Sequence, residues 1–323
     1  MDEFNDFETL RLMHTVMVLH FVEGQRQAEV AEKLNLSTSK VSRLIAQGRK
    51  RGMVRFTIES PFQRLMSLEE ELSRSGSLES AIVTPTYPGN PDTTLRQVGV
   101  VAGNHLLEDL RDGDIIAITG GRAVSAVVDN IKPDRKVDVT VVPLTGGVQG
   151  KFFTDVNSLA TRLAEALGGH AMVAHAPLFA ESGEQRNTLM QMGPIREVFD
   201  VSRRATVALV GIGSILSPGS SYYDLHPLAK NDREMLVSKG VVGEFMAQLI
   251  HQDGTRADYA LNDRIVALDP SEIAHCKRVI GVAAGEYKVR PIHAALNGHY
   301  VTALVTDEET TKAVLKLRKE SAT

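Results

Sequence analysis

Residues 80–306 alternate between short apolar runs and helical patterns, and this alternation constrains the fold more than any other feature of the chain. The runs DIIAIT at 114–119 and VDVTVVP at 137–143 are apolar almost throughout, as strands buried on both faces of a sheet require. Helical stretches between such strands predict an α/β domain with a mostly parallel sheet. The expected strands are 80–84, 114–119, 137–143, 171–174, 205–211, 264–268, 278–283 and 301–306, and the expected helices are 95–110, 123–130, 157–167 and 291–297.

Glycine recurs where these expected strands end. In open α/β sheets, ligands bind outside the carboxyl ends of the strands, where helix N-termini direct backbone amides at anions. Glycine permits close backbone approach, while threonine, serine, arginine and lysine add donors for phosphate. The glycines could instead serve only the conformation of the turns. Because several lie at one edge, we predict a site for a phosphate-bearing or polyhydroxyl ligand at Thr119-Gly120-Gly121-Arg122, Thr145-Gly146-Gly147, Gly211-Ile212-Gly213-Ser214 and Lys288.

The stretch QAEVAEKLNLSTSKVSRLIAQGRK, residues 27–50, has the spacing of a helix-turn-helix. Two apolar stripes at the helical period lie on either side of Asn35, a residue that tolerates the left-handed region of a tight turn. Ser37 suits the N-cap of the second helix. The first stripe is Ala28, Val30, Ala31 and Leu34, and the second is Val41, Leu44 and Ile45.

A helix over residues 7–23, ended by Gly24, is expected to brace this motif. Its apolar side consists of Leu10, Met13, His14, Met17, Val18 and Phe21. After Gly52, residues 53–61 alternate like a short strand, which would be half of a wing or a plain connection.

The charge distribution favours DNA as the partner of the motif. No acidic residue lies between Lys33 and Ile58, while six basic residues do. The net charge of the whole chain is −4, yet residues 1–60 carry +1 and the remainder −5. A basic helix in the major groove contacts phosphates and base edges, although a solvated pair of helices would show a similar run. The candidate DNA contacts are Gln27, Ser37, Thr38, Ser39, Lys40, Ser42, Arg43 and Arg49.

The length of 323 residues suits two domains. We expect an all-α, winged helix-turn-helix domain over 1–60, a linker or oligomerisation helix over 61–78, and an effector-binding and oligomerisation domain over 79–323. The linker helix, with Leu65, Leu68 and Leu72, would pair with a second copy or pack on its own domain.

Composition excludes several classes of protein. The single cysteine, Cys276, excludes an intramolecular disulfide and fits a reducing cytoplasm. The acidic start lacks the features of a signal peptide, and no apolar run approaches the roughly 20 residues that span a bilayer. We expect a cytoplasmic protein with no membrane partner, no metal site and no cofactor.

The N-terminal QAEVAEKLNLSTSKVSRLIAQGRKRGMVRFTI and the C-terminal VIGVAAGEYKVRPIHAALNGHYVTALVTDEET resemble the SorC-type, DeoR-like sugar-binding transcriptional regulators. Between them ITGGRAV, VVPLTGG, VALVGIGS and GVVGEF match further blocks of that family in order. The resemblance implies a fold related to ribose-phosphate isomerases and glucosamine-phosphate deaminases, used to sense a sugar or polyol rather than to convert it. It also implies a homotetramer or a dimer.

The resemblance further implies which residues contact the effector. Glu244 would bond ligand hydroxyls and Lys288 would pair with an anionic group. Arg122 departs from the small hydroxyl residues of many relatives, and Asn35 replaces their turn glycine. The implied loop contacts are Thr119, Gly120, Gly121, Arg122, Gly146, Gly147 and Gln149, and Gly213 joins them from the glycine pattern.

We predict a ligand-responsive regulator, a repressor of a sugar or polyol catabolic operon, with no catalytic residue. The alternative is a sugar-phosphate isomerase or deaminase with an accessory helix-turn-helix domain, which needs a general base. Its candidate carboxylates are Asp114, Glu181, Asp224, Glu244 and Asp263. A nicotinamide-dependent oxidoreductase is disfavoured because Leu216 stands at the third position of the glycine fingerprint.

Overall fold

The computed structural model describes residues 7–54, 65–149, 154–216 and 230–321. The chain forms two compact units, Met1–Ser60 and Pro61–Thr323, which are described separately. The interpretation of residues 61–78 as a separate oligomerisation helix stays a prediction. Within the described residues, no helix has both the length and the apolar character that crossing a membrane requires.

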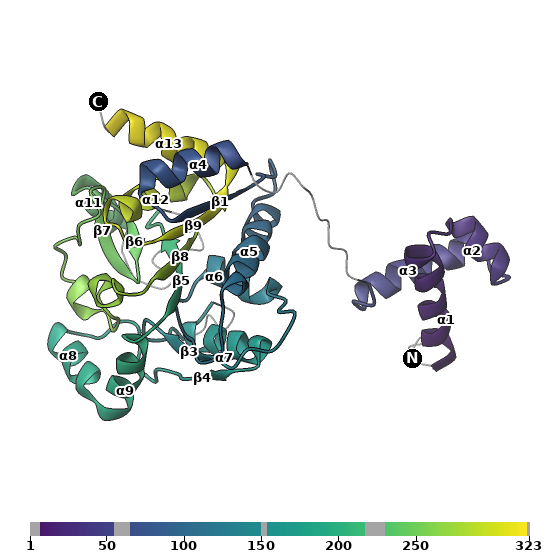
Figure 1. Ribbon diagram of the computed structural model, residues 1–323, viewed down its shortest axis with the longest axis horizontal. Coiled ribbons are helices and arrows are strands. Elements are labelled where there is room, and N and C mark those ends of the chain that lie inside the picture. The colour runs from purple at the N-terminus through teal and green to yellow at the C-terminus, as the bar shows by residue number, and fades with distance from the viewer. Residues whose placement is uncertain (1–6, 55–64, 150–153, 217–229, 322–323) are drawn as a thin grey trace. The chain divides into compact units, whose positions relative to one another are not determined.

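The first unit is helical (Figure 1). It contains α1 (Phe7–Met17), the π-helical turn η1 (Val18–Val22), α2 (Gln27–Lys33) and α3 (Thr38–Lys50). Its core is built from Met13, Val16, Met17, Leu19, Val30, Ala31, Val41, Leu44 and Ile45. The predicted wing at 53–61 lies almost wholly outside the described residues.

Two details of the predicted apolar stripes are wrong. Ala28 and His14 are exposed. Both lie at the edge of their stripe, where a small or polar side chain loses little by facing water.

Within the residues that the structure describes, the second unit is built on a nine-stranded sheet. Its main path runs β1-β9-β8-β5-β2-β3-β4, and all pairings along it are parallel. An antiparallel hairpin, β6 (Val241–Phe245) and β7 (Gln248–His251), joins β5 through β6. The predicted mostly parallel sheet is therefore confirmed. The other strands are β1 (Ser80–Thr84), β2 (Ile115–Ile118), β3 (Thr140–Pro143), β4 (His170–Ala171), β5 (Val207–Gly213), β8 (Arg278–Val282) and β9 (Ala303–Asp307).

Alternation along the strands divides the core between the two faces of the sheet. Ile116 and Leu209 pack with α5 (Pro91–Glu108), α6 (Arg122–Asn130) and α7 (Val156–Leu167). Their neighbours in sequence, Ala117 and Ala208, face the other core, which contains residues of α9, α12 and α13. Figure 1 shows α5 and α6 together beside the central strands. Helices on both faces explain why the strands are apolar throughout.

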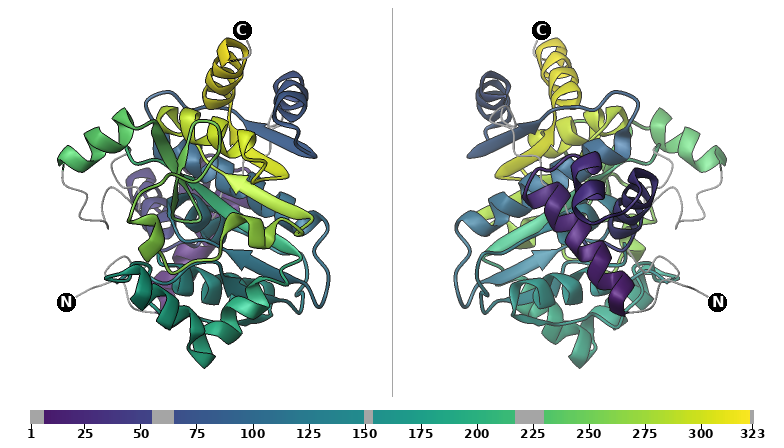
Figure 2. Two further views of the ribbon diagram at one scale, coloured as in Figure 1. Left: turned by 90° about the vertical axis from the view of Figure 1, so that its left-hand side faces the viewer. Right: turned by 90° about the vertical axis from the view of Figure 1, so that its right-hand side faces the viewer.

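The helices of the other face are α4 (Met66–Gly76), α9 (Gly193–Ser202), α12 (Val289–Asn297) and α13 (Glu308–Ser321), with α8 (Gly183–Gln191) and α11 (Lys230–Ser238) beside them. Short 3-10 turns are η2 (Asn262–Arg264), η3 (Pro270–Ile273) and η4 (Glu286–Lys288). Leu72 of α4 is fully buried, so α4 packs on its own unit. Figure 2 shows α13 at the C-terminal end of this unit.

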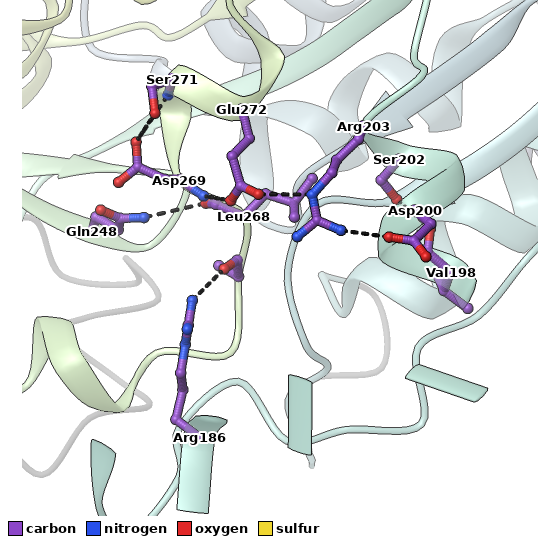
Figure 3. Close-up of polar contacts among 11 residues, drawn as sticks. Arg186, Val198, Asp200, Ser202, Arg203, Gln248, Leu268, Asp269, Ser271 and Glu272 are labelled. Atoms are coloured by element: carbon purple, nitrogen blue, oxygen red, sulfur yellow. Dashed lines mark hydrogen bonds and ion pairs between the residues drawn. The ribbon is translucent and has the colours of Figure 1, made fainter. Parts of the chain in front are cut away.

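The predicted strand at 264–268 is wrong, because the segment makes only isolated bridges, Phe179 with Ile265 and Thr145 with Ala267. It is apolar because its side chains are buried, not because it joins a ladder. Its backbone bonds neighbouring loops, as in the bond from the amide of Val266 to the carbonyl of Leu178 at 2.9 Å. Side chains add to these bonds: Arg186 donates to the carbonyl of Ala267, and Gln248 donates to that of Leu268 (Figure 3).

Ion pairs connect the residues that follow this segment to the end of α9. Arg203 donates to Glu272 at 2.7 Å and to Asp200 at 2.8 Å, and Glu272 also accepts from the amide of Asp269 at 2.7 Å (Figure 3). This network lies outside the pocket described below.

Candidate functional site

The turn between α2 and α3 takes the predicted form. Asn35 has φ 53, in the left-handed region that asparagine tolerates. Ser37 precedes α3 in an extended conformation, and its hydroxyl accepts from the amide of Lys40 at 3.2 Å. Ser37 is therefore the N-cap, which satisfies one of the amides left free at a helix start.

Burial on α3 separates the helix into two faces. Val41, Leu44 and Ile45 are buried against α1 and α2. Gly48 also faces this core, where an added Cβ would lie 2.7 Å from the sulfur of Met17, so glycine allows the close approach of α1 and α3. The opposite face consists of Thr38, Ser39, Lys40, Ser42 and Arg43, all exposed.

The remaining candidate DNA contacts lie at the edges of this exposed face. Gln27 is the half-buried first residue of α2. Arg49 is exposed near the end of α3, with its guanidinium 5.3 Å from the centre of the Phe21 ring. A guanidinium over an aromatic face is held in place by this contact. The exposed groups on α3 are hydroxyls, an amine and guanidinium groups, the chemical types with which proteins bond DNA phosphates and base edges.

The second unit contains a pocket of about 630 Å³ at the carboxyl ends of its strands. Residues that follow β1, β2, β3 and β8 line it, together with the ends of β5, β6 and β9. This is the position at which open α/β sheets bind ligands. Of the predicted effector contacts, the lining includes Thr119, Gly120, Gly121, Arg122, Gly146, Gly213, Glu244 and Lys288.

One wall of the pocket is the loop between β2 and α6. Thr119 accepts from the amide of Gly211 at 3.0 Å, which joins this loop to β5. Gly121 precedes α6 with φ 111, a conformation that favours glycine, and provides no side-chain cap. The first amides of α6 have no partner within the helix, so this end of the pocket suits an anion.

A second wall is formed where β5 meets β6. Gly213 pairs with Glu244, and a Cβ on Gly213 would lie 1.7 Å from the Glu244 carboxylate. Glycine at this position is therefore required for the carboxylate to lie over the strand. The carboxylate accepts from the amide of Ala247 at 2.8 Å. Burial raises the pKa of Glu244, although nearby Lys288 opposes that shift.

Lys288 provides a cation at the third wall, in η4 immediately before α12. Burial and, to a smaller extent, the guanidinium of Arg122 lower the pKa of its ammonium to about 8, against the opposing effect of Glu244. Arg122 itself forms an ion pair with Asp92 at 2.8 Å, at an exposed position. A carboxylate, a lysine and an arginine thus meet in one pocket, as recognition of hydroxyls and an anionic group requires.

Two predicted contacts lie outside the lining. Gly147 is packed against Asp155 and Asn157, where an added Cβ would come within 2.9 Å of either side chain. Gln149 is exposed. The loop Gly211–Gly213 also differs from its prediction, because these residues belong to strand β5 rather than to a strand-to-helix turn. A dinucleotide fingerprint needs these glycines in a strand-to-helix turn, so their position within β5 argues against a dinucleotide-binding site.

Part of the lining was not predicted from the sequence. The loop after β1 contributes Thr86 and Tyr87, and η4 contributes Glu286 and Tyr287. Asp307, at the end of β9, also lines the pocket and is buried. Gly89 and Gly285 were the residues of the sequence that could have indicated these loops, since each has a positive φ that favours glycine.

Of the carboxylates considered for an enzyme, Glu244 alone among those described lines the pocket. Asp114 instead accepts from the amide of Arg111 and the hydroxyl of Thr206, and Asp263 pairs with Arg256. Glu181 lies outside the lining, and Asp224 is outside the described residues. No group of histidine, cysteine or carboxylate side chains suited to a metal ion occurs in the part of the chain that the structure describes.

Comparison with known proteins relates both units to regulators. The model of the Sugar-bind family, a sugar-binding domain, matches residues 60–316, and that of sigma-70 region 4 matches residues 12–51. The erythritol catabolism regulatory protein EryD of Brucella abortus (strain 2308) is 31% identical over 299 residues, which cover 92% of this chain and 94% of that protein. The sorbitol operon regulator of Klebsiella pneumoniae is 29% identical over 317 residues, or 96% and 99% of the two chains.

A solved structure shows the same fold over both units. The crystal structure of the full-length sorbitol operon regulator SorC from Klebsiella pneumoniae superposes with a TM-score of 0.72 at 27% identity. The match covers 95% of this chain and 99% of that chain.

Proposed function

The chain belongs to the SorC family of sugar-binding, ligand-responsive transcriptional regulators, and we propose that it represses a catabolic operon and is released by a phosphorylated sugar or polyol. Relatives are named for erythritol catabolism, a sorbitol operon and deoxyribonucleosides, which supports a small polyhydroxyl effector. A transcriptional regulator of this kind acts in the cytoplasm.

One observation carries the proposal. The pocket combines a carboxylate for hydroxyl groups, Glu244, with a half-buried cation, Lys288, beside the first amides of α6, which have no partner within the helix. A carboxylate accepts bonds from a polyol, whereas an ammonium and helix-terminal amides stabilise a phosphate. A phosphorylated polyol therefore satisfies both ends of the pocket better than a neutral one.

Effector binding has to reach the DNA-binding unit, and α4 is the element through which we propose that it does. Glu69 of α4 accepts from the amide of Val83 in β1 at 3.0 Å, and β1 leads into the pocket loop at Thr86. Arg318 of α13 bonds the carbonyl of Ser75 at the other end of α4. The effector changes DNA affinity to the extent that it binds one arrangement of these elements more tightly than another.

A dimer or tetramer completes the proposal. Two recognition helices related by a twofold axis would bind half-sites about one helical turn of DNA apart, or a multiple of that distance. This geometry predicts an operator with an inverted repeat.

The test measures binding of the purified full-length protein to its own upstream DNA, at a stated salt concentration, by fluorescence anisotropy. The panel of effectors is erythritol, sorbitol, their phosphates and inorganic phosphate. We expect specific binding that one phosphorylated compound weakens. Binding that no compound changes, or no specific binding at all, contradicts the proposal, and multiple turnover of a sugar phosphate would favour the enzyme instead.

Lys288→Met provides the matched control for the pocket. Methionine has similar length but no charge, so the variant should bind the operator normally and resist release by the phosphorylated compound. Normal release of this variant from the operator by the phosphorylated compound would show that Lys288 does not contact the effector.

A further inference from the structure

Asp307 is a buried carboxylate at the point where two walls of the effector pocket meet. It is the last residue of β9 and is 1% exposed. On one side lies the loop after β1, with Thr86 and Tyr87, and on the other lies the loop that leads from β8 to Lys288. A buried carboxylate is costly unless hydrogen bonds satisfy it, so its partners indicate its role.

Each carboxylate oxygen of Asp307 accepts from a different loop. Oδ2 accepts from the amide of Gly285 at 3.0 Å and from the hydroxyl of Thr310. Oδ1 accepts from the hydroxyl of Thr86 at 2.6 Å and from the amide of Thr310 at 3.3 Å. A carboxylate has about four acceptor positions, and these four donors occupy them. Asp307 is therefore committed to the protein and has no acceptor position left for a ligand.

These bonds fix both walls of the pocket. The amide of Lys288 donates to the carbonyl of Gly285 at 2.9 Å, so Lys288 is two hydrogen bonds away from Asp307. Gly285 has φ 102, a conformation that glycine adopts readily, and its amide also donates to the hydroxyl of Thr310 at 2.8 Å. On the other side, the hydroxyl of Thr86 also accepts from the amide of Glu309 at 2.9 Å, which holds the Tyr87 loop against the start of α13.

We propose that Asp307 is a positioning residue of the effector site, which holds the Lys288 loop and the Tyr87 loop at the separation that an anionic ligand requires. The inference rests on the proposed function of the pocket. It assigns to Asp307 a role that acts through Lys288 and the neighbouring amides rather than through contact with the effector. Preorganised groups bind more tightly because their ordering is complete before the ligand arrives.

Asp307→Asn is the decisive substitution because it keeps the size of the side chain and replaces one acceptor oxygen by a donor NH₂ group. Whichever way the amide turns, its NH₂ faces a backbone amide, that of Gly285 or that of Thr310, and backbone amides cannot accept. With its NH₂ towards Gly285, the variant loses the bond to the Lys288 loop. With its NH₂ towards Thr86, it loses the bond to the amide of Thr310 in α13, and the hydroxyl of Thr86 has to turn from donor to acceptor. Either orientation weakens the attachment of the loops to residue 307. Glu308→Gln is the matched control, since it makes the same chemical change at the next residue, whose carboxylate pairs with Lys312 outside the pocket lining.

The experiment titrates the full-length wild type and both variants with inorganic phosphate by calorimetry, and with the phosphorylated compound that releases wild type from DNA. Hydrogen exchange of the peptide that spans 285–288 is measured without ligand. We expect Asp307→Asn to weaken phosphate binding about tenfold or more, the scale of a lost hydrogen bond to a charged group. Exchange should rise at 285–288 and stay unchanged in β5, and Glu308→Gln should behave as wild type.

The outcomes separate this inference from the proposed function. If wild type binds phosphate and Asp307→Asn binds it equally well, the inference about Asp307 is wrong, while the proposed function of the pocket is unaffected. Weaker binding with unchanged exchange at 285–288 also overturns it, because the loop would not have moved. If wild type binds no phosphate and no member of the effector panel, the proposed function fails and the inference fails with it.

Discussion

The recognition face of α3 and the effector pocket bring their functional side chains together in different ways. On α3 the five exposed candidate contacts lie within residues 38–43, so one helix and its N-cap place all of them. In the pocket, the lining extends from Thr86 to Asp307 and comes together only because parallel strands end at one edge. Local spacing is sufficient for the first surface, whereas the second depends on strand order and on one hairpin.

The comparison predicts that the two surfaces can be impaired independently. Lys40→Ala combined with Arg43→Ala should weaken specific operator binding by about 2–6 kcal/mol, since contacts of this kind are each worth about 1–3 kcal/mol. Phosphate binding at the pocket should be unchanged. Anisotropy at fixed salt measures the first effect and calorimetry the second.

Lys33→Ala is the control for that double variant, because Lys33 is an exposed lysine on α2 that lies near Glu23. It should lose far less affinity. Normal operator binding by the double variant would show that the recognition helix is misplaced.

Gly213→Ala tests whether the pocket depends on a close tertiary contact. The added Cβ would lie 1.7 Å from the Glu244 carboxylate, which has to move. Loss of its bond to the effector should weaken binding on the order of tenfold. Gly193→Ala is the control, since a Cβ there meets nothing within 4 Å. Equal effector affinity in the two variants would contradict the position given to Glu244.

The pH dependence of anion binding tests whether the charge of Lys288 contributes to the affinity for the anion. Its pKa is lowered from 10.5 to about 8, so the ammonium is lost earlier than in an exposed lysine. Phosphate requires the charged form, and its affinity should therefore fall by up to about tenfold per pH unit as the pH rises above about 8. Calorimetry between pH 7.5 and about 9.5 checks this, with Lys288→Arg as the control that keeps its charge. A flat profile for wild type would show that Lys288 stays protonated or does not contact the anion.

The smallest expected effect concerns the N-cap of α3 and tests whether local hydrogen bonding sets the start of this helix. Ser37→Ala removes the N-cap bond to Lys40 and should cost about 1 kcal/mol of local stability. Amides of α3 should then exchange about fivefold faster. Ser39→Ala, two residues later and exposed, should leave exchange nearly unchanged. No difference between the two variants would mean that packing on α1, and not the cap, sets the start of the helix.

The strand-to-helix loop at Thr119–Arg122 was predictable because its glycines directly precede a helix. The loop at 146–149 was predicted only in part, since Gly146 lines the pocket while Gly147 supports Asp155 and Asn157. Both are glycines after the same strand, and the sequence does not show which of them faces a ligand. The segment 264–268 was read as a strand because burial alone makes a segment apolar.

The sequence by itself determined the helix after the turn with its cap, the alternation of strands and helices that is typical of a parallel sheet, and the edge of the sheet at which the pocket lies. These follow from periodicities of a few residues and from the conformations that glycine, asparagine and serine favour. The tertiary structure alone decided that the β6–β7 hairpin brings Glu244 over Gly213, and that Asp307 joins Thr86 to Gly285. Contacts between residues more than 20 positions apart depend on strand order and side-chain packing, which leave no period in the sequence.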